Sequence, residues 1–538
     1  MSTRTWRGYA VAQAEVQTLT PANPQEGVVY TATINGKDVT YTVTAADMAD
    51  GASDEAAAVA KAVDGLVAAW NASTIPEFAE ITASDSTTAM TLTHDTSGVP
   101  FTVSGAGTNG ISAQNEVQTL TITGTPTGGT FTLTYDGQTT STIAYNADAA
   151  TVDAALEALS NIGAGDVTCA GGALPGTPVT IQFTSALAQL NVALITADGS
   201  GLTGGSSPDA AVATTTPGSA GDPTLANATT TSATGPNHFD NADNWSGGAV
   251  PVDSDDIVFE NSDVDCKYGL SQTSVSPAST TVKMSYTGKI GLPRKNSNGY
   301  IEYRTTYLTI GDSGDGVTNT VEIGEGTGAG SGRLKISTND SQTILNVLNT
   351  GQGAESGIPA LLWKGTHASN VANLQKGSVG IAFFDGESAT LSDLNVNYVT
   401  NVTGDVQLRC GDGLTLTTVD MAGGQVTLES AATTINQYNG ELTHRSGNIT
   451  TLTIDGGTYF EEAANTTTTL LVGSDGVYDC RRNLKSRTIT NISLHERSAF
   501  HDPFGTVTAS NGYDFVRCTP GDVTFNVKPH QTWTPTSI

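Results

Sequence analysis

One seven-residue stretch in the last quarter of the chain decides the fold: TVDMAGG at residues 418–424 returns as TINQYNG at 434–440 and as TLTIDGG at 451–457. In every copy an apolar residue follows a threonine, and a glycine closes the stretch. The threonine–apolar pair continues at Leu470 and Ile489, with spacings that grow from 16 to 19 residues. One short strand and one glycine turn per unit indicate the coils of a β-solenoid. A β-sandwich with regular hairpins is the alternative.

The β-solenoid-like domain is expected to span residues 238–538, and its two open ends must be covered. Asp240–Phe259 is the expected first cap, and Phe500–Trp533 is the expected last cap. The apolar side chains of the last cap would be Phe504, Phe515 and Phe525. Three such coils could share a flat apolar face, so a homotrimer is expected.

Upstream, the sequence repeats itself at an offset of 101 residues. The run EVQTLT at 15–20 recurs at 116–121, and YTATING at 30–36 aligns with FTLTYDG at 131–137. Apolar residues alternate with threonine at period two, which is typical of half-buried strands. The Asn-Gly and Asp-Gly endings favour hairpins.

A helical segment follows each hairpin, at Asp54–Asn71 and at Thr151–Asn161, and two further strands close each unit. Each unit therefore follows the order strand–strand–helix–strand–strand, which predicts α+β modules at residues 15–110 and 111–202. The fold class is thus expected to be mainly β, with two tandem small α+β modules followed by the β-solenoid-like domain.

Two segments lie outside these domains. Residues 1–14 are expected to form an N-terminal arm. Residues 203–237 consist mostly of Thr, Ser, Gly, Pro and Ala, with few large apolar side chains. Such a composition contributes little core and predicts a linker.

The charge of the chain is strongly acidic and unevenly distributed. Its 538 residues include 23 basic and 53 acidic ones, for a formal net charge of −30. Residues 1–240 hold 4 of these bases and 22 of these acids, and no Lys or Arg occurs from Ala62 to Cys266. This charge argues against direct binding to nucleic acid or to anionic lipid.

The sequence also bears on membranes and on redox chemistry. No stretch approaches the roughly 18–20 consecutive apolar residues of a membrane helix, and no apolar run follows Arg4 and Arg7 as in a signal peptide. We therefore expect no membrane association and no export by the general secretory route. The five cysteines are widely spaced, odd in number and without any Cys-x-x-Cys, so free thiols in a reducing cell are expected.

Because β-solenoids also serve as scaffolds for polysaccharide-cleaving enzymes, paired acids deserve a search. Glycoside hydrolysis needs two facing carboxyl groups about 5–10 Å apart. Asp385 and Glu387 share strand parity and could both point outward, although Asp385-Gly386-Glu387 is more typical of a turn. Glu461 and Glu462 are neighbours and would face opposite sides of a strand. We therefore expect no catalytic residue.

Metal and cofactor motifs are equally weak. The seven histidines show no His-x-x-x-His spacing, and His495 and His501 are expected in a structural loop. Gly324–Gly330 is rich in glycine, but no Lys-Ser/Thr follows it, so a tight turn is expected instead of a phosphate-binding loop. We expect neither a metal nor a cofactor.

The basic residues gather in a few places. Two clusters in the C-terminal half consist of Arg294, Lys295 and Arg304, and of Arg481, Arg482, Lys485 and Arg487. These clusters could dock an acidic neighbour or pair with nearby acids of the same chain. At the N-terminus two cations alternate with two aromatic rings, which is the composition of an interface anchor. The candidate capsid-docking residues are Arg4, Trp6, Arg7 and Tyr9.

Several stretches carry a resemblance. They are Arg4-Thr5-Trp6, Ile34–Lys37, Thr74–Glu80, Asn244–Pro251, Leu362–Asn370 and Asp502–Val507, together with the Thr/Gly-rich middle unit Val117–Gly205. In these stretches the chain resembles a group of tailed-phage and prophage virion structural proteins without assigned chemistry, some of them in planctomycete genomes. The middle unit is similar to a module that recurs in phage structural proteins. The resemblance implies a virion component.

Taken with the composition, this resemblance predicts a non-enzymatic virion protein that is assembled in the host cytoplasm. A capsid decoration or cement protein is expected, with the major capsid protein or other virion proteins as partners. A tail fibre or spike that binds a host surface glycan is one alternative. A β-helix polysaccharide depolymerase is the other.

Overall fold

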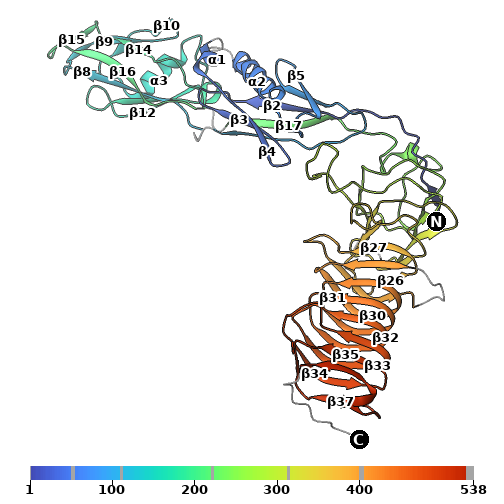
Figure 1. Cartoon of the computed structure of the whole chain (residues 1–538). Coiled ribbons are helices and arrows are strands. Elements are labelled where there is room, and N and C mark those ends of the chain that lie inside the picture. The colour runs from blue at the N-terminus through green and yellow to red at the C-terminus, as the bar shows by residue number, and fades with distance from the viewer. Residues whose placement is uncertain are drawn as a thin grey trace. The chain divides into compact units, whose positions relative to one another are not determined.

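The computed structural model describes residues 2–49, 55–108, 113–219, 223–311, 316–398 and 405–528 (Figure 1). The predicted mainly β composition is confirmed. The chain divides into two compact units, each assembled from separate segments. Unit 1 comprises Met1–Glu15, Thr96–Phe101 and Ser232–Ile538, and unit 2 comprises Val16–Asp95 and Thr102–Thr231.

The first part of unit 2 contains two small sheets and two helices. Its elements are β2 (Val16–Ala22), β3 (Val29–Ile34), β4 (Lys37–Thr42), α1 (Ala45–Ala49), α2 (Glu55–Asn71), β5 (Ile81–Asp85), β6 (Met90–His94) and β7 (Ser104–Thr108). One sheet has the order β17-β2-β6-β5, in which β17 is the later strand Thr224–Thr231, and the other has the order β4-β3-β7. Helix α2 buries Leu66 and Trp70, and the Trp70 ring packs edge-on against Phe78 with ring centroids 4.6 Å apart.

The second part of unit 2 has a matching set of elements. They are β8 (Val117–Thr123), β9 (Gly128–Tyr135), β10 (Gln138–Thr139), β11 (Ile143–Ala144), α3 (Ala149–Glu157), β12 (Val167–Gly171), β13 (Val179–Phe183), η1 (Ser185–Leu187), β14 (Thr196–Asp198) and β15 (Leu202–Thr203). One sheet has the order β12-β13-β8-β16, in which β16 is the later strand Asp209–Thr216, and strand β9 is the centre of the other sheet. The Asp148 carboxylate caps α3 by accepting a hydrogen bond from the Thr151 backbone N–H.

Two closing strands occupy the segment for which the sequence predicts a linker. Strand β16 (Asp209–Thr216) pairs antiparallel with β8, and β17 (Thr224–Thr231) pairs antiparallel with β2. Short Ala and Thr side chains suffice here because these strands bury few positions, among them Ala210 and Leu225. Residues 203–237 therefore contribute one sheet strand to each part of unit 2.

The two closing strands return in the same register. Gln13 forms an isolated antiparallel bridge with Thr234, and Gln114, which lies 101 residues later, forms one with Ser219. The ladders continue with Val16 opposite Thr231 and with Val117 opposite Thr216, and both contain a bulge at the same place. Residues 113–219 thus lie along the chain between β7 and β17, two strands of the first part of unit 2.

Unit 1 contains one long ladder of parallel strands (Figure 1). Its strands are β1 (Thr3–Thr5), β18 (Asp256–Phe259), β19 (Ser271–Gln272), β20 (Ser279–Lys283), β21 (Leu308–Ile310), β22 (Asn319–Glu325), β23 (Leu334–Ser337), β24 (Thr343–Val347), β25 (Leu361–Lys364), β26 (Val371–Leu374), β27 (Gly377–Ile381), β28 (Ala389–Val396), β29 (Val406–Cys410), β30 (Leu414–Leu428), β31 (Ala432–His444), β32 (Ile449–Glu461), β33 (Thr466–Asp479), β34 (Arg487–Leu494), β35 (Ala499–Asp502), β36 (Val507–Ala509), β37 (Tyr513–Phe515) and β38 (Thr524–Val527). Short helical turns are η2 (Ala242–Asn244) and η3 (Pro520–Asp522).

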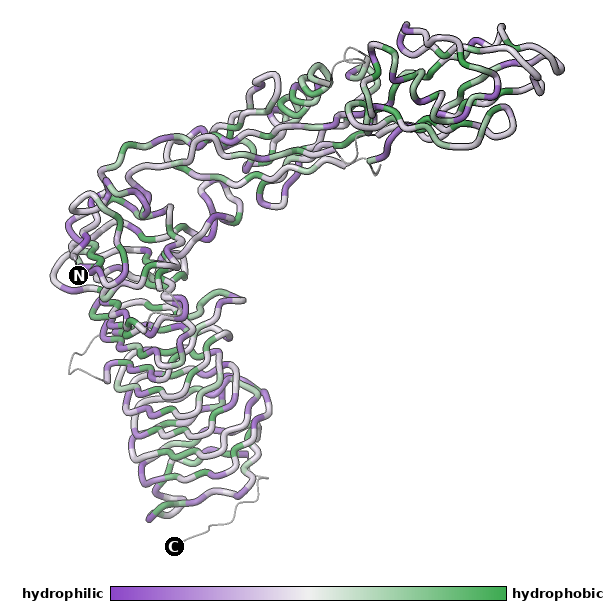
Figure 2. Tube along the Cα trace, turned by 180° about the vertical axis from the view of Figure 1, so that it is seen from behind, coloured by the Kyte–Doolittle hydropathy of each residue, from purple (hydrophilic) through white to green (hydrophobic). Residues whose placement is uncertain are grey.

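The pairing pattern changes along this ladder. From β18 to β28 each strand pairs with the strand two places further on, for example β24 with β26 and β25 with β27. The strands β30, β31, β32 and β33 are longer, with 13 to 15 residues, and they pair with their immediate successors. Hydrophobic and hydrophilic residues alternate along the trace, and the apolar ones form one contiguous core (Figure 2).

The residues quoted at the outset are register partners. Val419 lies opposite Ile435, Ile435 opposite Leu452 and Leu452 opposite Leu470, and all four are fully buried. The next partner is Ile492, whereas the sequence predicts Ile489. The shift of three residues arises because the loop between β33 and β34 is three residues longer than the loop before β33.

The predicted caps and arm are only partly as expected. Within residues 1–14, β1 pairs in parallel with β18, so this segment belongs to the main ladder. Phe515 is buried near the last strands, but Phe504 is 51% exposed and does not cover the core. Trp533, the end of the predicted last cap, lies outside the described residues.

Candidate functional site

The predicted N-terminal anchor is largely used within unit 1. The Arg4 Nε lies 3.1 Å from the Asp255 Oδ2, and the Trp6 side chain is 1% exposed. The Trp6 indole N–H donates to the Val264 carbonyl oxygen, and its ring lies edge-on to Trp245. Of the four predicted docking residues, Arg7 and Tyr9 remain exposed, and Tyr9 is 74% exposed.

The carboxylate pairs do not face one another as a catalytic pair. The Glu387 carboxylate accepts a hydrogen bond from the Phe384 N–H, and the Glu387 N–H donates to the Phe384 carbonyl oxygen. This closed turn agrees with the structural interpretation of Asp385-Gly386-Glu387. Glu461 is fully buried, whereas Glu462 pairs with Arg445 at the surface, with 3.3 Å between Nε and Oε2.

The buried Glu461 belongs to a polar cluster that sequence reasoning missed. Its carboxylate lies 3.2 Å from the His444 Nδ1 and accepts hydrogen bonds from the Tyr459 hydroxyl, the Asn465 amide and the Ala463 N–H. The other His444 nitrogen faces the Ser430 carbonyl oxygen at 3.2 Å, and a carbonyl can only accept. The cluster is therefore a closely hydrogen-bonded polar network inside the core. The signal available in the sequence is the 17-residue separation, which equals the register offset between β31 and β32.

The basic clusters mostly have partners within the chain. The Arg304 guanidinium contacts the Glu302 carboxylate with 2.6 Å between Nε and Oε1, and Arg481 contacts Asp479 at 2.7 Å. The buried Arg487 donates to the Ala463 and Asn483 carbonyl oxygens and to the Thr506 hydroxyl. These contacts favour intramolecular pairing over docking for most of the two clusters.

Metal and membrane features can be stated for the part of the chain that the structure covers. Among those residues, no group of three or more His, Cys, Asp or Glu side chains could hold a metal ion. Within the same ranges, no helix is long and apolar enough to cross a membrane.

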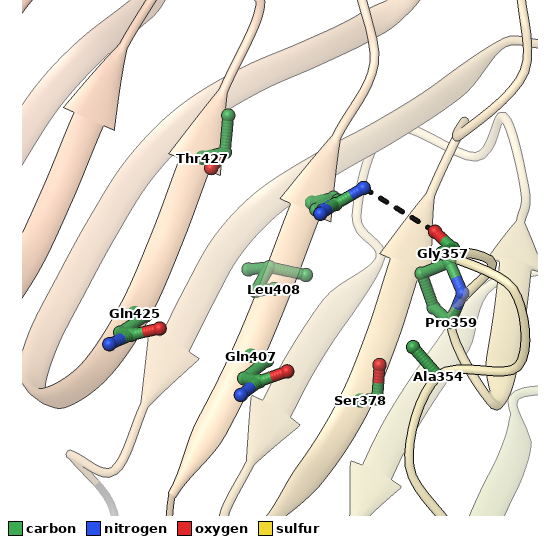
Figure 3. Close-up of a pocket in the computed structure, with 9 residues that line it drawn as sticks. Ala354, Gly357, Pro359, Ser378, Gln407, Leu408, Gln425 and Thr427 are labelled. Atoms are coloured by element: carbon green, nitrogen blue, oxygen red, sulfur yellow. Dashed lines mark hydrogen bonds between the residues drawn. The ribbon is translucent and has the colours of Figure 1, made fainter.

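A shallow groove runs across the outer face of β27, β29, β30 and β31. One hollow of about 180 Å³ is lined by Ser378, Gln407, Arg409, Gln425 and Thr427, and by the hairpin that contains Gly357 (Figure 3). The Arg409 guanidinium donates to the Gly357 carbonyl oxygen at 3.4 Å and so ties this hairpin to the sheet. Sequence reasoning did not single out these residues, because exposed polar residues also alternate with buried ones on other strands of unit 1.

A second hollow of about 310 Å³ continues the first. It shares Gln407 and Gln425 with it and extends to Gly424, Gly440 and Glu441. Ser378, Gln407, Gln425 and Glu441 are successive register partners on four adjacent parallel strands. Neighbouring members of this row are therefore about 4.8 Å apart along the groove.

Two tyrosines stack near the second hollow. The rings of Tyr398 and Tyr438 lie at an angle of 16° with their centroids 5.4 Å apart, and the residues are 48% and 40% exposed. Partial burial, the hydrogen bond between the two hydroxyls and the nearby Asp420 and Asp455 raise the pKa of Tyr438. Tyr438 lies two residues before Gly440, which lines the hollow.

Comparison with known proteins gives one partial likeness. A tail sheath protein of Mycobacterium phage Bxz1 is 43% identical to this chain over 96 residues. No protein-family model matches the chain. The matched segment covers 18% of this chain and 15% of the sheath protein, so the likeness concerns a small part of each.

Proposed function

We propose that this chain is a non-enzymatic structural component of a phage particle. The observation that carries the proposal is the 43% identity with part of a phage tail sheath protein. Proteins that share a module within one class of particle commonly use it for assembly instead of chemistry. The resemblance of the sequence to phage structural proteins supports the same conclusion.

The geometry of unit 1 also supports a structural role. Its apolar side chains form a continuous core, and Glu461, the buried member of the candidate acid pairs, is saturated with hydrogen bonds. A catalytic carboxyl group would need an open position beside it for substrate. We infer that the parallel ladder is a β-solenoid and that unit 2 arose by duplication of one α+β module.

The more specific proposal is a head decoration or cement protein, as a homotrimer bound to the major capsid protein. In that role the extended core would stabilise the shell, and unit 2 would be displayed. A tail location is the second candidate, because the protein with the partial likeness is a tail sheath protein.

Localisation on purified particles tests these proposals. Antibodies against unit 2, combined with cryo-electron microscopy and quantitative mass spectrometry, would give the place and copy number of the chain. Hundreds of copies on the shell support decoration, and a ring or fibre on the tail supports the second candidate. Absence of the chain from purified particles would contradict the structural role altogether.

A further inference from the structure

We propose that the groove and the adjoining corner of β28, β30 and β31 bind a neutral carbohydrate chain. Tyr398 and Tyr438 would stack on the apolar faces of sugar rings, and Gln407, Gln425 and Glu441 would bind sugar hydroxyls. This binding activity goes beyond the particle role and holds for a head or a tail location alike.

The aromatic pair is held in place while its rings stay open to solvent. Val396, Met421 and Gln437 are register partners in three successive strands, and the two tyrosines follow the first and the third of them. The middle strand continues as Ala422-Gly423-Gly424, which leaves room for the rings to meet across it. Two stacked rings at roughly half exposure form a flat apolar surface with polar hydroxyl edges, and such surfaces mark binding sites.

Two glycines line the hollow near the aromatic pair. Gly424 and Gly440 have φ of +84° and +91°, a backbone conformation that favours glycine. A Cβ on Gly424 would lie 2.8 Å from the Val406 carbonyl oxygen, and a Cβ on Gly440 would lie 2.6 Å from the Met421 methyl group. Both positions therefore favour glycine, and neither adds a side chain to the lining of the hollow.

The polar row supplies hydrogen-bonding groups that the fold itself does not use. In the described structure, the side chains of Gln407, Gln425 and Glu441 make no hydrogen bond or ion pair. Each amide offers two donors and an acceptor, and the carboxylate offers acceptors, so together they match the mixed character of sugar hydroxyls. Their regular spacing along the groove suits a ligand that itself repeats at short intervals.

The charges around the site favour a neutral ligand. Asp405 and Glu441 line the second hollow, and Asp420 and Asp455 lie near the Tyr438 hydroxyl. These acids would repel nucleic acid, anionic glycans and anionic lipid. Arg409, a cation of the groove, already donates to the Gly357 carbonyl oxygen. An apolar peptide would lack a matching pocket, because amide, hydroxyl and charged groups make up most of the lining side chains.

Affinity electrophoresis of the full-length chain tests the proposal. Native gels would contain a neutral bacterial exopolysaccharide such as dextran or levan, and a glycan array would extend the test to neutral surface glycans. We expect the wild type to be retarded by at least one neutral polysaccharide. Tyr398→Ala combined with Tyr438→Ala should weaken binding about tenfold or more, because the stacking surface is lost. Gln425→Ala should weaken it by a smaller factor.

Matched variants separate binding from folding. Tyr438→Trp keeps a stacking ring and should retain binding, and Tyr9→Ala removes a more exposed ring elsewhere and should leave binding unchanged. All variants should melt at the wild-type temperature. The proposal is overturned when no neutral glycan retards the wild type, or when the double tyrosine variant binds as the wild type does. Incorporation of the double variant into particles reports separately on the structural role.

Discussion

The two units solve the problem of strand pairing in opposite ways. In the C-terminal strands of unit 1, partners such as Val419 and Ile435 are 16 residues apart and lie on parallel strands. In unit 2, Val16 pairs antiparallel with Thr231, which is 215 residues away. Nearest-neighbour stacking makes stability a local sum, whereas a distant closing strand couples the two ends of a module. The comparison predicts where each unit is vulnerable.

Unit 1 also contains a distant pairing, and breaking it should have the largest effect. Trp6 follows β1, is 1% exposed and packs against Trp245 and Phe259. Trp6→Ala should lower the free energy of unfolding of unit 1 by about 4 kcal/mol, since an aromatic ring is lost from a packed core. Urea denaturation followed by circular dichroism measures this. Tyr9→Ala is the control, and equal effects of both changes would refute the role of Trp6.

Next in size is the buried pair between successive coils. Glu461→Leu would leave the His444 ring facing a buried apolar group, and should cost about 3 kcal/mol. The surface change Glu462→Gln removes a contact with Arg445 and should cost less than about 1 kcal/mol. Replacing both His444 and Glu461 by leucine should restore part of the stability. Thermal melting of the three variants measures these effects, and a harmless Glu461→Leu would contradict a stabilising role of the pair.

A surface ladder of amides should contribute less. The Asn373 side-chain amide donates to the Asn346 Oδ1 at 2.9 Å, and the Asn373 Oδ1 accepts from the Asn395 side-chain amide at 3.0 Å. Asn373→Ala should cost about 1–2 kcal/mol, because two hydrogen bonds are lost together. Asn511→Ala removes a single exposed bond to Asn491 and should cost less. Equal melting temperatures for the two variants would contradict a larger contribution from the two hydrogen bonds of Asn373.

The units should also differ in their response to alkaline pH. Burial and the nearby Arg333 lower the pKa of Lys335 from 10.5 to about 8, while Glu387 opposes them and Lys364 and Arg294 add to them. The unfolded state therefore binds more protons between these values, so this lysine makes unit 1 more stable as pH rises from about 8 toward 10.5.

Lys335→Met should remove this contribution, and wild type minus variant isolates it because other titrating groups are common to both. The measurement is the free energy of unfolding of unit 1 at pH 7, 8 and 9, which lies below the ordinary tyrosine pKa. A difference that stays constant with pH would contradict the lowered pKa.

The smallest effect is expected from removing residues 115–218, which make up the second part of unit 2. Gln114 and Ser219 exchange two backbone hydrogen bonds, at 3.0 and 2.9 Å. Replacing residues 115–218 by an Asn-Gly turn should change the stability of unit 1 by less than about 0.5 kcal/mol. It should also leave β2, β6 and β17 paired, which amide hydrogen exchange would show. Loss of protection in β2 would mean that the first part of unit 2 needs the second part in order to fold.

The sequence predicted the strand register of unit 1 where the repeat is nearly regular. Val419, Ile435, Leu452 and Leu470 are register partners because the loops between their strands, of three or four residues, differ little in length. Ile489 was the wrong continuation, since a longer loop moved the partner to Ile492. A repeat in sequence therefore fixes the register of strands only as long as the connections keep their length.

Distant pairing was beyond the sequence. Thr3–Thr5 is too short to show a strand period, and its partner β18 lies about 250 residues away. The Thr and Ala strands of 203–237 lack the large apolar side chains by which buried strands are recognised. The candidate groove was missed for a related reason. The polar residues that line it lie on different strands, and only the strand register brings them together.

The two matching bridges, Gln13 with Thr234 and Gln114 with Ser219, have a consequence for how such a chain can lengthen in evolution. At Gln114 and Ser219 the entering and leaving segments lie side by side, so one in-frame insertion of coding sequence adds a whole module without altering its host. In the second part of unit 2, the position that corresponds to this bridge lies between β14 and β16. A third copy inserted there would lengthen the chain by the same genetic step and would leave the strands that are already paired in place.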